Sequence, residues 1–158
     1  KSAKKAFLKD KYADALAKVS KEIEKGKLEG EDATAAEGIQ AWLDWYGSSA
    51  LEGAKKEAEE GKVYEAASTY EHVAEVFKKH DFAKEADAAM KELLSDKDRK
   101  LEYKAGEKLA KIMEEIKELK PKKALLKIKP LLGKKYRETA AGKKAAKVAE
   151  ALEAELNR

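Results

Sequence analysis

The sequence predicts an all-α protein, and three observations carry this prediction. Ala, Lys, Glu and Leu dominate the chain, and charged residues make up 42% of it, which is typical of helices with solvated outer faces. Apolar residues recur at helical spacing, whereas the β-branched and aromatic residues that favour strands are sparse. The length of 158 residues fits one domain, or at most two small ones, and suits a buried core; we expect a single domain over residues 1–158.

Three segments share one pattern of apolar residues, and this pattern locates three of the expected helices. The segments begin at Tyr12, Val63 and Pro121, and a lysine precedes each of them. An alanine follows at the third position after the start, an Ala or Leu at the fourth, and apolar residues at the seventh and eleventh. These offsets lie on one face of an α-helix. We therefore expect each segment to bury this face against a neighbouring helix.

Breaks between apolar stretches predict helices near residues 2–9, 11–26, 32–60, 62–79, 82–94, 97–119, 121–135 and 138–156. Gly26 and Gly30 separate the second helix from the third, for which Asp32 is the expected N-cap. Ser95 or Asp96 is expected to cap the sixth helix. Pro121 suits a first helical position, where its missing N–H is no loss.

The alternation of helix, tight turn and helix resembles tetratricopeptide-like repeats. The residues that carry the resemblance lie in the second helix of each pair, and they are Tyr12, Ala15, Leu16, Val19, Val63, Ala66, Ala67, Tyr70, Ala124, Leu125 and Ile128. The segments begin 51 and then 58 residues apart, whereas the family repeats every 34 residues or so. Ala3 and Ala54 stand at the small-residue position of the first helices, but Ile112 stands there in the third.

This resemblance implies an architecture and a setting. It implies antiparallel helical hairpins stacked as a short right-handed solenoid of about 7–8 helices, with units at 1–30, 31–80 and 81–135 and a closing helix at 138–156. Similar arrays occur in exported bacterial proteins, sometimes beside a thioredoxin-like domain, which favours an exported or periplasmic compartment. Because the chain begins with Lys1, we expect a processed chain or a part of a longer protein. No apolar run reaches the roughly 18 residues of a membrane span, so none is expected.

The first candidate contact surface lies in segment 41–46, which holds both tryptophans of the chain. On a helix, Trp42 and Tyr46 share a broad apolar face, and Trp45 lies at its edge, about 60° from Trp42. Aromatic residues at this spacing usually pack in a core, and we prefer that interpretation. The alternative is that Trp45 lines a groove and anchors a partner, because Trp and Tyr are enriched at interface hot spots.

The second candidate surface is basic. Between Leu119 and Arg137 there is no acidic residue, and eight are basic: Lys120, Lys122, Lys123, Lys127, Lys129, Lys134, Lys135 and Arg137. A solvated helix face is the preferred interpretation, and sequence-independent binding of a polyanion through residues 120–137 is the alternative. Nucleic acid is not an expected partner, because base recognition needs aromatic residues and Arg, and Tyr136 is the only aromatic here.

The charges are unevenly distributed along the chain. Residues 120–158 carry 12 basic and 4 acidic groups, a net charge of +8, whereas residues 31–60 carry 2 basic and 8 acidic groups, a net charge of −6. Opposed charges of this kind suggest head-to-tail association between copies of the chain as a further hypothesis. The alternative is that both ends only confer solubility.

The sequence contains no recognisable catalytic motif. The absence of Cys excludes disulfides and thiolate metal sites. His72 and His80 lie about 12 Å apart along a straight helix, too far to share one metal ion, and we interpret both as surface residues. We therefore expect no enzymatic activity, no metal and no cofactor. The predicted function is a protein-interaction or scaffold module that binds a protein or peptide. A structural subunit of a larger complex, or a helical appendage to an upstream catalytic domain, is the alternative.

Overall fold

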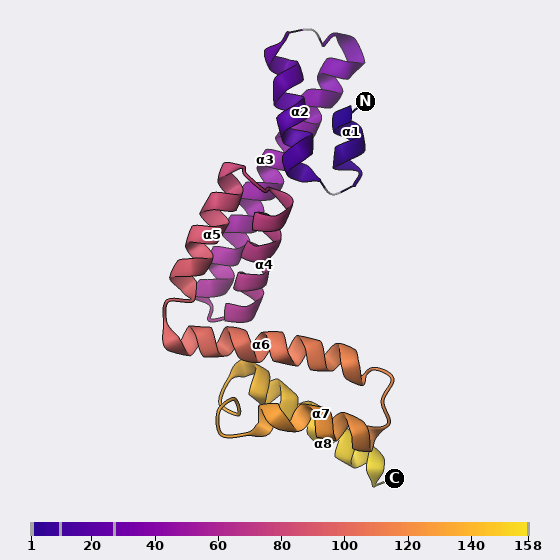
Figure 1. Ribbon diagram of the computed structural model, residues 1–158, viewed down its shortest axis with the longest axis vertical. Coiled ribbons are helices and arrows are strands. Elements are labelled where there is room, and N and C mark those ends of the chain that lie inside the picture. The colour runs from indigo at the N-terminus through magenta and orange to yellow at the C-terminus, as the bar shows by residue number, and fades with distance from the viewer. Residues whose placement is uncertain (1, 10, 27, 158) are drawn as a thin grey trace. The chain divides into compact units, whose positions relative to one another are not determined.

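Figure 1 shows a computed structural model of the chain, which describes residues 2–9, 11–26 and 28–157. The helices are α1 (Ser2–Phe7), α2 (Tyr12–Glu24), α3 (Gly30–Glu59), α4 (Val63–Val76), α5 (Asp81–Leu93), α6 (Lys97–Ile116), α7 (Pro121–Leu132) and α8 (Ala140–Leu156). These described residues contain no strand. The all-α prediction is confirmed, and every expected helix is found within three residues of its predicted bounds.

The three segments with the shared apolar pattern form α2, α4 and α7. Tyr12, Val63 and Pro121 are the first residues of these helices. The residues at the third, fourth and seventh positions are buried, apart from Leu125, which is half-buried. Each of these helices packs against the helix that precedes it in the chain. The pattern therefore identified both the starts of the helices and the faces that they bury.

Contacts between residues divide the chain into two compact units, Lys1–Glu92 and Leu93–Arg158, called unit 1 and unit 2 below. In unit 1, α3 packs against both α2 and α4, and α1 packs against α2 (Figure 1). In unit 2, each of α6, α7 and α8 packs against the other two. The boundary between the two units, after Glu92, differs from the repeat boundaries expected near residues 30, 80 and 135. The single domain and the right-handed solenoid stay predictions.

The core of unit 2 combines alanines, most of them on α8, with branched residues on α6 and α7. Its buried members are Ala105 and Ile112 of α6, Ile128 and Leu131 of α7, and Ala141, Ala145 and Ala149 of α8. The alanines let α8 come close to its neighbours, and the branched side chains fill the remaining space. Ile112, which departs from the small-residue pattern of the first helices, is thus a core residue of this bundle.

The helix starts show one confirmed cap and one wrong prediction. The carboxylate of Asp96 accepts hydrogen bonds from the backbone N–H groups of Asp98, at 3.0 Å, and Arg99, at 2.8 Å, and so caps α6. Asp32 does not cap α3, because the helix begins two residues earlier, at Gly30. Gly30 has a left-handed φ of +56°, which lets the chain turn into the helix there. Asp32 instead lies in the first turn, where its charge suits the helix dipole.

Gly47 is a point of close approach between α3 and α5. The residue is buried, and a Cβ added to it would lie 2.9 Å from Cγ of Phe82 and closer still to two other atoms of that ring. Gly53, further along the same helix, has no atom within 4 Å of an added Cβ. Only the first of these two glycines is therefore required by packing.

We expect Gly47→Ala to destabilise the protein by about 1–3 kcal/mol, because the Phe82 ring has to move out of a packed position. Gly53→Ala is the matched control on the same helix. It should be neutral or stabilise by up to about 1 kcal/mol, because Ala has the higher helix propensity. Urea unfolding followed by far-UV circular dichroism measures both variants. Equal effects of the two substitutions would contradict this role of Gly47.

Candidate interaction surfaces

An aromatic cluster joins the first three helices of unit 1 to the end of α4. Trp42 stacks on Tyr46, with ring centroids 5.0 Å apart and an interplanar angle of 8°. Phe7 and Tyr12 meet Trp42 edge-on, with centroids at 5.1 and 5.6 Å. Fully buried Phe77 contacts both Tyr12 and Tyr46. The structure thus brings Trp42 and Tyr46 together inside a packed cluster, although Trp42 keeps 36% of its surface exposed.

Trp45 does not join this cluster, and its side chain is 62% exposed. Leu43 and Gly47, two residues away on either side, are both buried. At 100° per residue each lies about 160° from Trp45, so the indole projects from the side of α3 opposite its buried face. Sequence reasoning placed Trp45 at the edge of the apolar face, whereas the structure places it at the centre of the exposed one.

Each histidine forms a hydrogen bond with an aromatic residue that lies next to it. The Tyr46 hydroxyl and Nε2 of exposed His72 lie 3.0 Å apart and form a hydrogen bond between α3 and α4. Nδ1 of half-buried His80 accepts a hydrogen bond from the backbone N–H of Phe82 at 3.3 Å, at the start of α5. The surface interpretation describes His72 well. That His80 accepts a hydrogen bond at the start of α5 was not predicted. Its position just before an expected helix was the signal that could have indicated this role.

A cleft of about 460 Å³ lies beside His72 in unit 1, and Lys11, Asp14, Glu75 and Lys78 also line it. Its two lysines and two carboxylates balance in formal charge, so the cleft does not select for an ion of one sign. Within the described ranges, no three side chains of His, Asp or Glu are grouped so that they could hold a metal ion.

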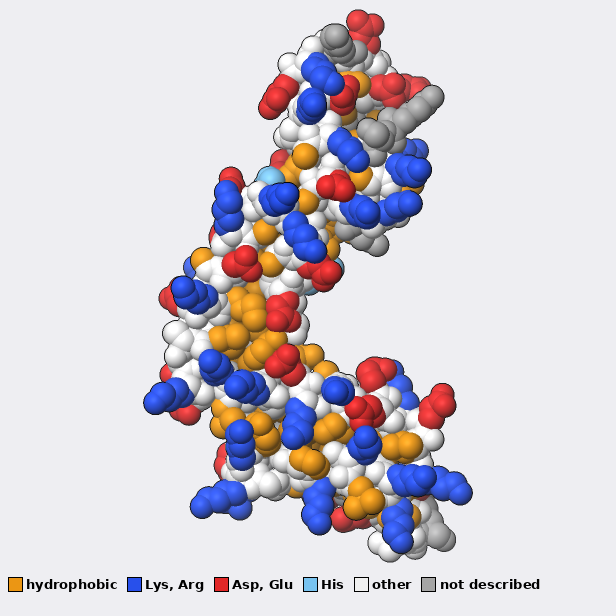
Figure 2. Space-filling model, in the orientation of Figure 1, with side chains coloured by type: hydrophobic (Ala, Val, Ile, Leu, Met, Phe, Trp, Pro, Cys, Tyr) orange, Lys and Arg blue, Asp and Glu red, His pale blue; other side chains and the backbone are white. Residues whose placement is uncertain are grey.

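The basic segment consists of Lys120, which precedes α7, the helix α7 itself and the loop that follows it, and all eight of its basic residues are exposed. Figure 2 shows Lys and Arg side chains at many points on the visible face of unit 2. Lys127 forms an ion pair with Glu115 of α6 at 2.8 Å, and its hydrogen bond and charge hold the pKa of Glu115 below the ordinary 4.5. Arg137 pairs with its neighbour Glu138 at 3.1 Å. The segment is therefore accessible, with two of its cations already paired.

An exposed leucine lies in the middle of the lysines of α7. Leu126 is 67% exposed, whereas Ala124 and Ile128, two residues away on either side, are buried. Leu126 therefore lies opposite the buried face of α7, as Trp45 does on α3. The sequence offered a signal for this residue, because Leu126 falls outside the shared offsets that mark the buried face.

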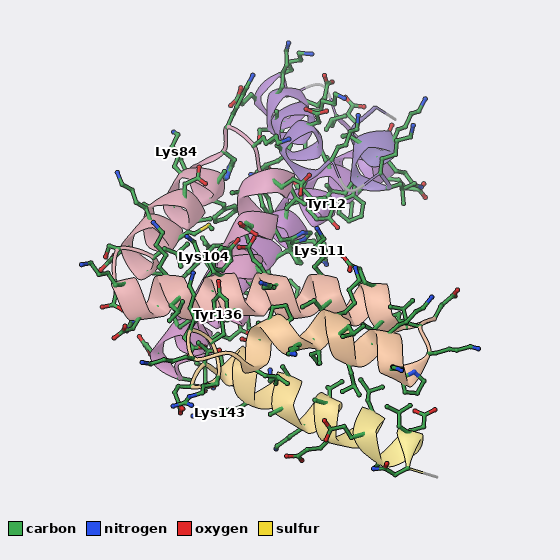
Figure 3. The ribbon with its side chains drawn as sticks, turned by 60° about the horizontal axis from the view of Figure 1, so that its bottom comes forward. Tyr12, Lys84, Lys104, Lys111, Tyr136 and Lys143 are labelled. Carbon is green, nitrogen blue, oxygen red and sulfur yellow. The ribbon has the colours of Figure 1, made fainter. Side chains whose placement is uncertain are left out.

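The loop between α7 and α8, and the first residue of α8, both contact α6. The amines of Lys108 and Lys135 lie 5.5 and 5.0 Å from the centroid of the Tyr136 ring, which Figure 3 labels. The carboxylate of Glu102 in α6 accepts a hydrogen bond at 3.0 Å from the backbone N–H of Ala140, the first residue of α8. The half-buried Tyr136 ring is thus already in contact with two cations, which sequence reasoning did not anticipate.

No protein-family model, curated protein or solved structure matches this chain. The tetratricopeptide-like resemblance accordingly stays a prediction from the residues that carry it. In the part of the chain that the structure describes, no helix has both the length and the apolar character needed to cross a bilayer.

Proposed function

We propose that this chain is a protein-interaction module without catalytic activity, and that its principal contact residue is Trp45 of α3. The observation that carries the proposal is the 62% exposure of this indole on the side of α3 opposite the core. A large apolar side chain in that position contributes little to the packing of its own unit, and Trp is among the residue types that most often dominate the binding energy of an interface. The exposed part of Trp42 lies one turn away and extends the same surface.

The neighbours of Trp45 suit the approach of a protein or peptide. Ala41 and Ser48, one turn before and after it, are exposed and small, so they leave room for another backbone. Glu37 and Glu52 lie about two turns away on the same side of α3 and are also exposed. An apolar anchor at the centre with charged residues further out matches the apolar core and polar rim of protein interfaces.

We propose further that the helices form a tetratricopeptide-like array. In support, α2, α4 and α7 begin at equivalent points of the shared pattern and pack against α1, α3 and α6 respectively. Pairing of each patterned helix with the helix before it is what a repeated hairpin would give.

Trp45→Ala tests the proposed function. We expect the variant to bind a partner at least tenfold more weakly, because truncation of a hot-spot tryptophan costs about 2 kcal/mol or more of binding free energy. Its thermal midpoint should stay close to that of the unchanged protein, because substitutions at exposed positions alter stability by about 0.5 kcal/mol or less. Partners captured from a native extract are first identified by mass spectrometry, and their affinities are then measured with purified proteins.

Trp42→Ala is the matched control on the same helix. It removes the stack on Tyr46 and the edge contacts with Phe7 and Tyr12, so we expect a clear loss of stability. A large loss of stability in Trp45→Ala would make Trp45 a core residue and contradict the proposal. Unchanged affinity of Trp45→Ala for every identified partner would contradict it as well.

A further inference from the structure

We infer that a second copy of this chain is a partner of the Trp45 surface, and that it docks through the exposed face of α7 centred on Leu126. The inference rests on the proposed function, because it assigns a partner to the same tryptophan. Two features of the chain carry it: each of the two helices has one large apolar side chain that is more than half exposed, and the charges around these side chains are opposite in sign.

The α3 side of this contact is acidic. From Gly30 to Ala54 the helix has five carboxylates, Glu31, Asp32, Glu37, Asp44 and Glu52, and no basic residue. All five are exposed, and within the described residues none of them forms an ion pair. Trp45 lies between Glu37 and Glu52 along the exposed side of the helix. This surface, Trp45 with its flanking carboxylates, is called the acidic face below.

The α7 side of the contact is basic. Lys122, Lys123 and Lys129 lie within about 60° of Leu126 around the helix, at most one turn away along it. All three lysines are exposed, and in the described part of the chain none of them has an ion-pair partner. Lys127 of the same helix already holds the carboxylate of Glu115 at 2.8 Å, which shows that a lysine of α7 can pair closely with a carboxylate on another helix. This surface, Leu126 with these three lysines, is called the basic face below.

The two faces complement one another in chemistry. Burial of Leu126 against Trp45 removes two exposed apolar side chains from water, and the lysines around one then face the carboxylates around the other. An anionic lipid or a nucleic acid would pair with the lysines of the basic face. It would not account for the exposure of Trp45 and the carboxylates around it. A second copy of the chain accounts for both faces at once.

The expected association is head-to-tail and weak. The two faces are different surfaces, so each copy offers one free face after pairing and larger assemblies can grow. A contact centred on one helix from each partner falls at the small end of protein interfaces, below about 1,200 Å². We therefore expect dissociation constants of about 0.1 mM, and a strong dependence on salt because the charged residues stay near solvent.

Sedimentation velocity or light scattering on the whole chain tests the inference. At about 20 mM salt the mean mass should rise as the protein concentration increases from about 10 µM to 1 mM, and at about 300 mM salt it should fall toward the monomer mass. Leu126→Ser should weaken association at least tenfold without loss of helix content, because the residue lies outside the core. A monomer mass at every concentration in low salt would overturn the inference.

Charge reversal on the two faces provides the decisive test of the inference. Glu37→Lys/Glu52→Lys makes the acidic face basic, and Lys122→Glu/Lys129→Glu makes the basic face acidic, so each variant alone should be monomeric through repulsion between like charges. An equimolar mixture of the two variants should associate again, because each reversed face then meets a complementary one. Lys143→Glu/Lys147→Glu on α8 changes the net charge as much as the α7 variant does, and it should associate normally. A mixture that stays monomeric, or an equal loss in the α8 control, would overturn the inference.

Other occupants of the basic face give different results. Vesicles rich in phosphatidylserine, or a short DNA duplex, bound by a chain that stays monomeric would assign α7 to an anionic surface and overturn the role of the second copy. Failure of the mass measurements leaves the proposed function standing, because binding of a different protein by Trp45 is measured separately.

Discussion

Phe77→Ala is expected to destabilise the protein by about 3–5 kcal/mol, the usual cost of emptying a phenylalanine site in a core. Phe77 is fully buried just after the end of α4. Its ring contacts Tyr12 at 5.9 Å and Tyr46 at 6.2 Å, on α2 and α3. It also contacts Phe82 at 5.1 Å, at the start of α5. Removal of this ring therefore takes packing from three helices of unit 1, α2, α3 and α5, at the same point.

Urea unfolding followed by far-UV circular dichroism gives the magnitude. Phe77→Leu keeps most of the apolar volume and should lose clearly less stability than Phe77→Ala. Trp45→Ala, on the surface of the same unit, should lose about 0.5 kcal/mol or less. A loss below about 1 kcal/mol for Phe77→Ala would mean that the aromatic cluster does not hold these helices together.

Gly142→Ala is expected to destabilise the protein by about 2–4 kcal/mol, although alanine is the better helix former. Gly142 lies in the first turn of α8, against the loop that precedes the helix. An added Cβ would lie 2.7 Å from the carbonyl carbon of Tyr136 and closer still to its oxygen. Those atoms belong to the backbone, so the clash cannot be relieved by rotation of a side chain.

The displaced loop would also weaken the start of α8. The backbone N–H of Gly142 donates a hydrogen bond to the Thr139 hydroxyl at 2.9 Å, which caps the helix. Thr139→Ala removes this cap together with the hydrogen bond from the Thr139 hydroxyl to the carbonyl of Tyr136, and it should cost about 1–2 kcal/mol, less than Gly142→Ala. Both are compared with Gly53→Ala by urea unfolding, because that glycine has no close neighbour. Unchanged or increased stability of Gly142→Ala would show that the loop can move away freely.

The sequence predicted the helices well because their signals are local. Tyr12, Val63 and Pro121 mark the first residues of three helices, since the apolar offsets and the absent N–H of Pro121 act within a few residues. The prediction of an N-cap for α6 was confirmed at Asp96, because capping also acts within a few residues. The prediction of Asp32 as the N-cap of α3 was wrong, because the left-handed conformation of Gly30 starts the helix earlier. Both Gly30 and Asp32 are compatible with a helix start.

The tertiary features could not be predicted from one sequence. In the sequence, Gly47, Gly53 and Gly142 are all glycines within expected helices, and only the neighbouring helix or loop in the structure shows that Gly47 and Gly142 are sites of close approach. The exposure of the basic segment followed from its charge, since unpaired lysines are not buried. The outward position of Trp45 did not follow, because the buried side of a helix depends on which helices surround it, whereas that of Leu126 is consistent with its place outside the shared offsets.

The placement of both tryptophans in α3 makes the two units separately visible by fluorescence. Unit 2 contains Tyr103 and Tyr136 as its only aromatic side chains, so tryptophan emission reports on unit 1 alone. Circular dichroism reports on the helices of both units. If the two signals change at the same denaturant concentration, the units unfold as one cooperative block; if they separate, each unit has its own stability. The tryptophan fluorescence of the unmodified protein therefore follows the unfolding of unit 1 without an added label.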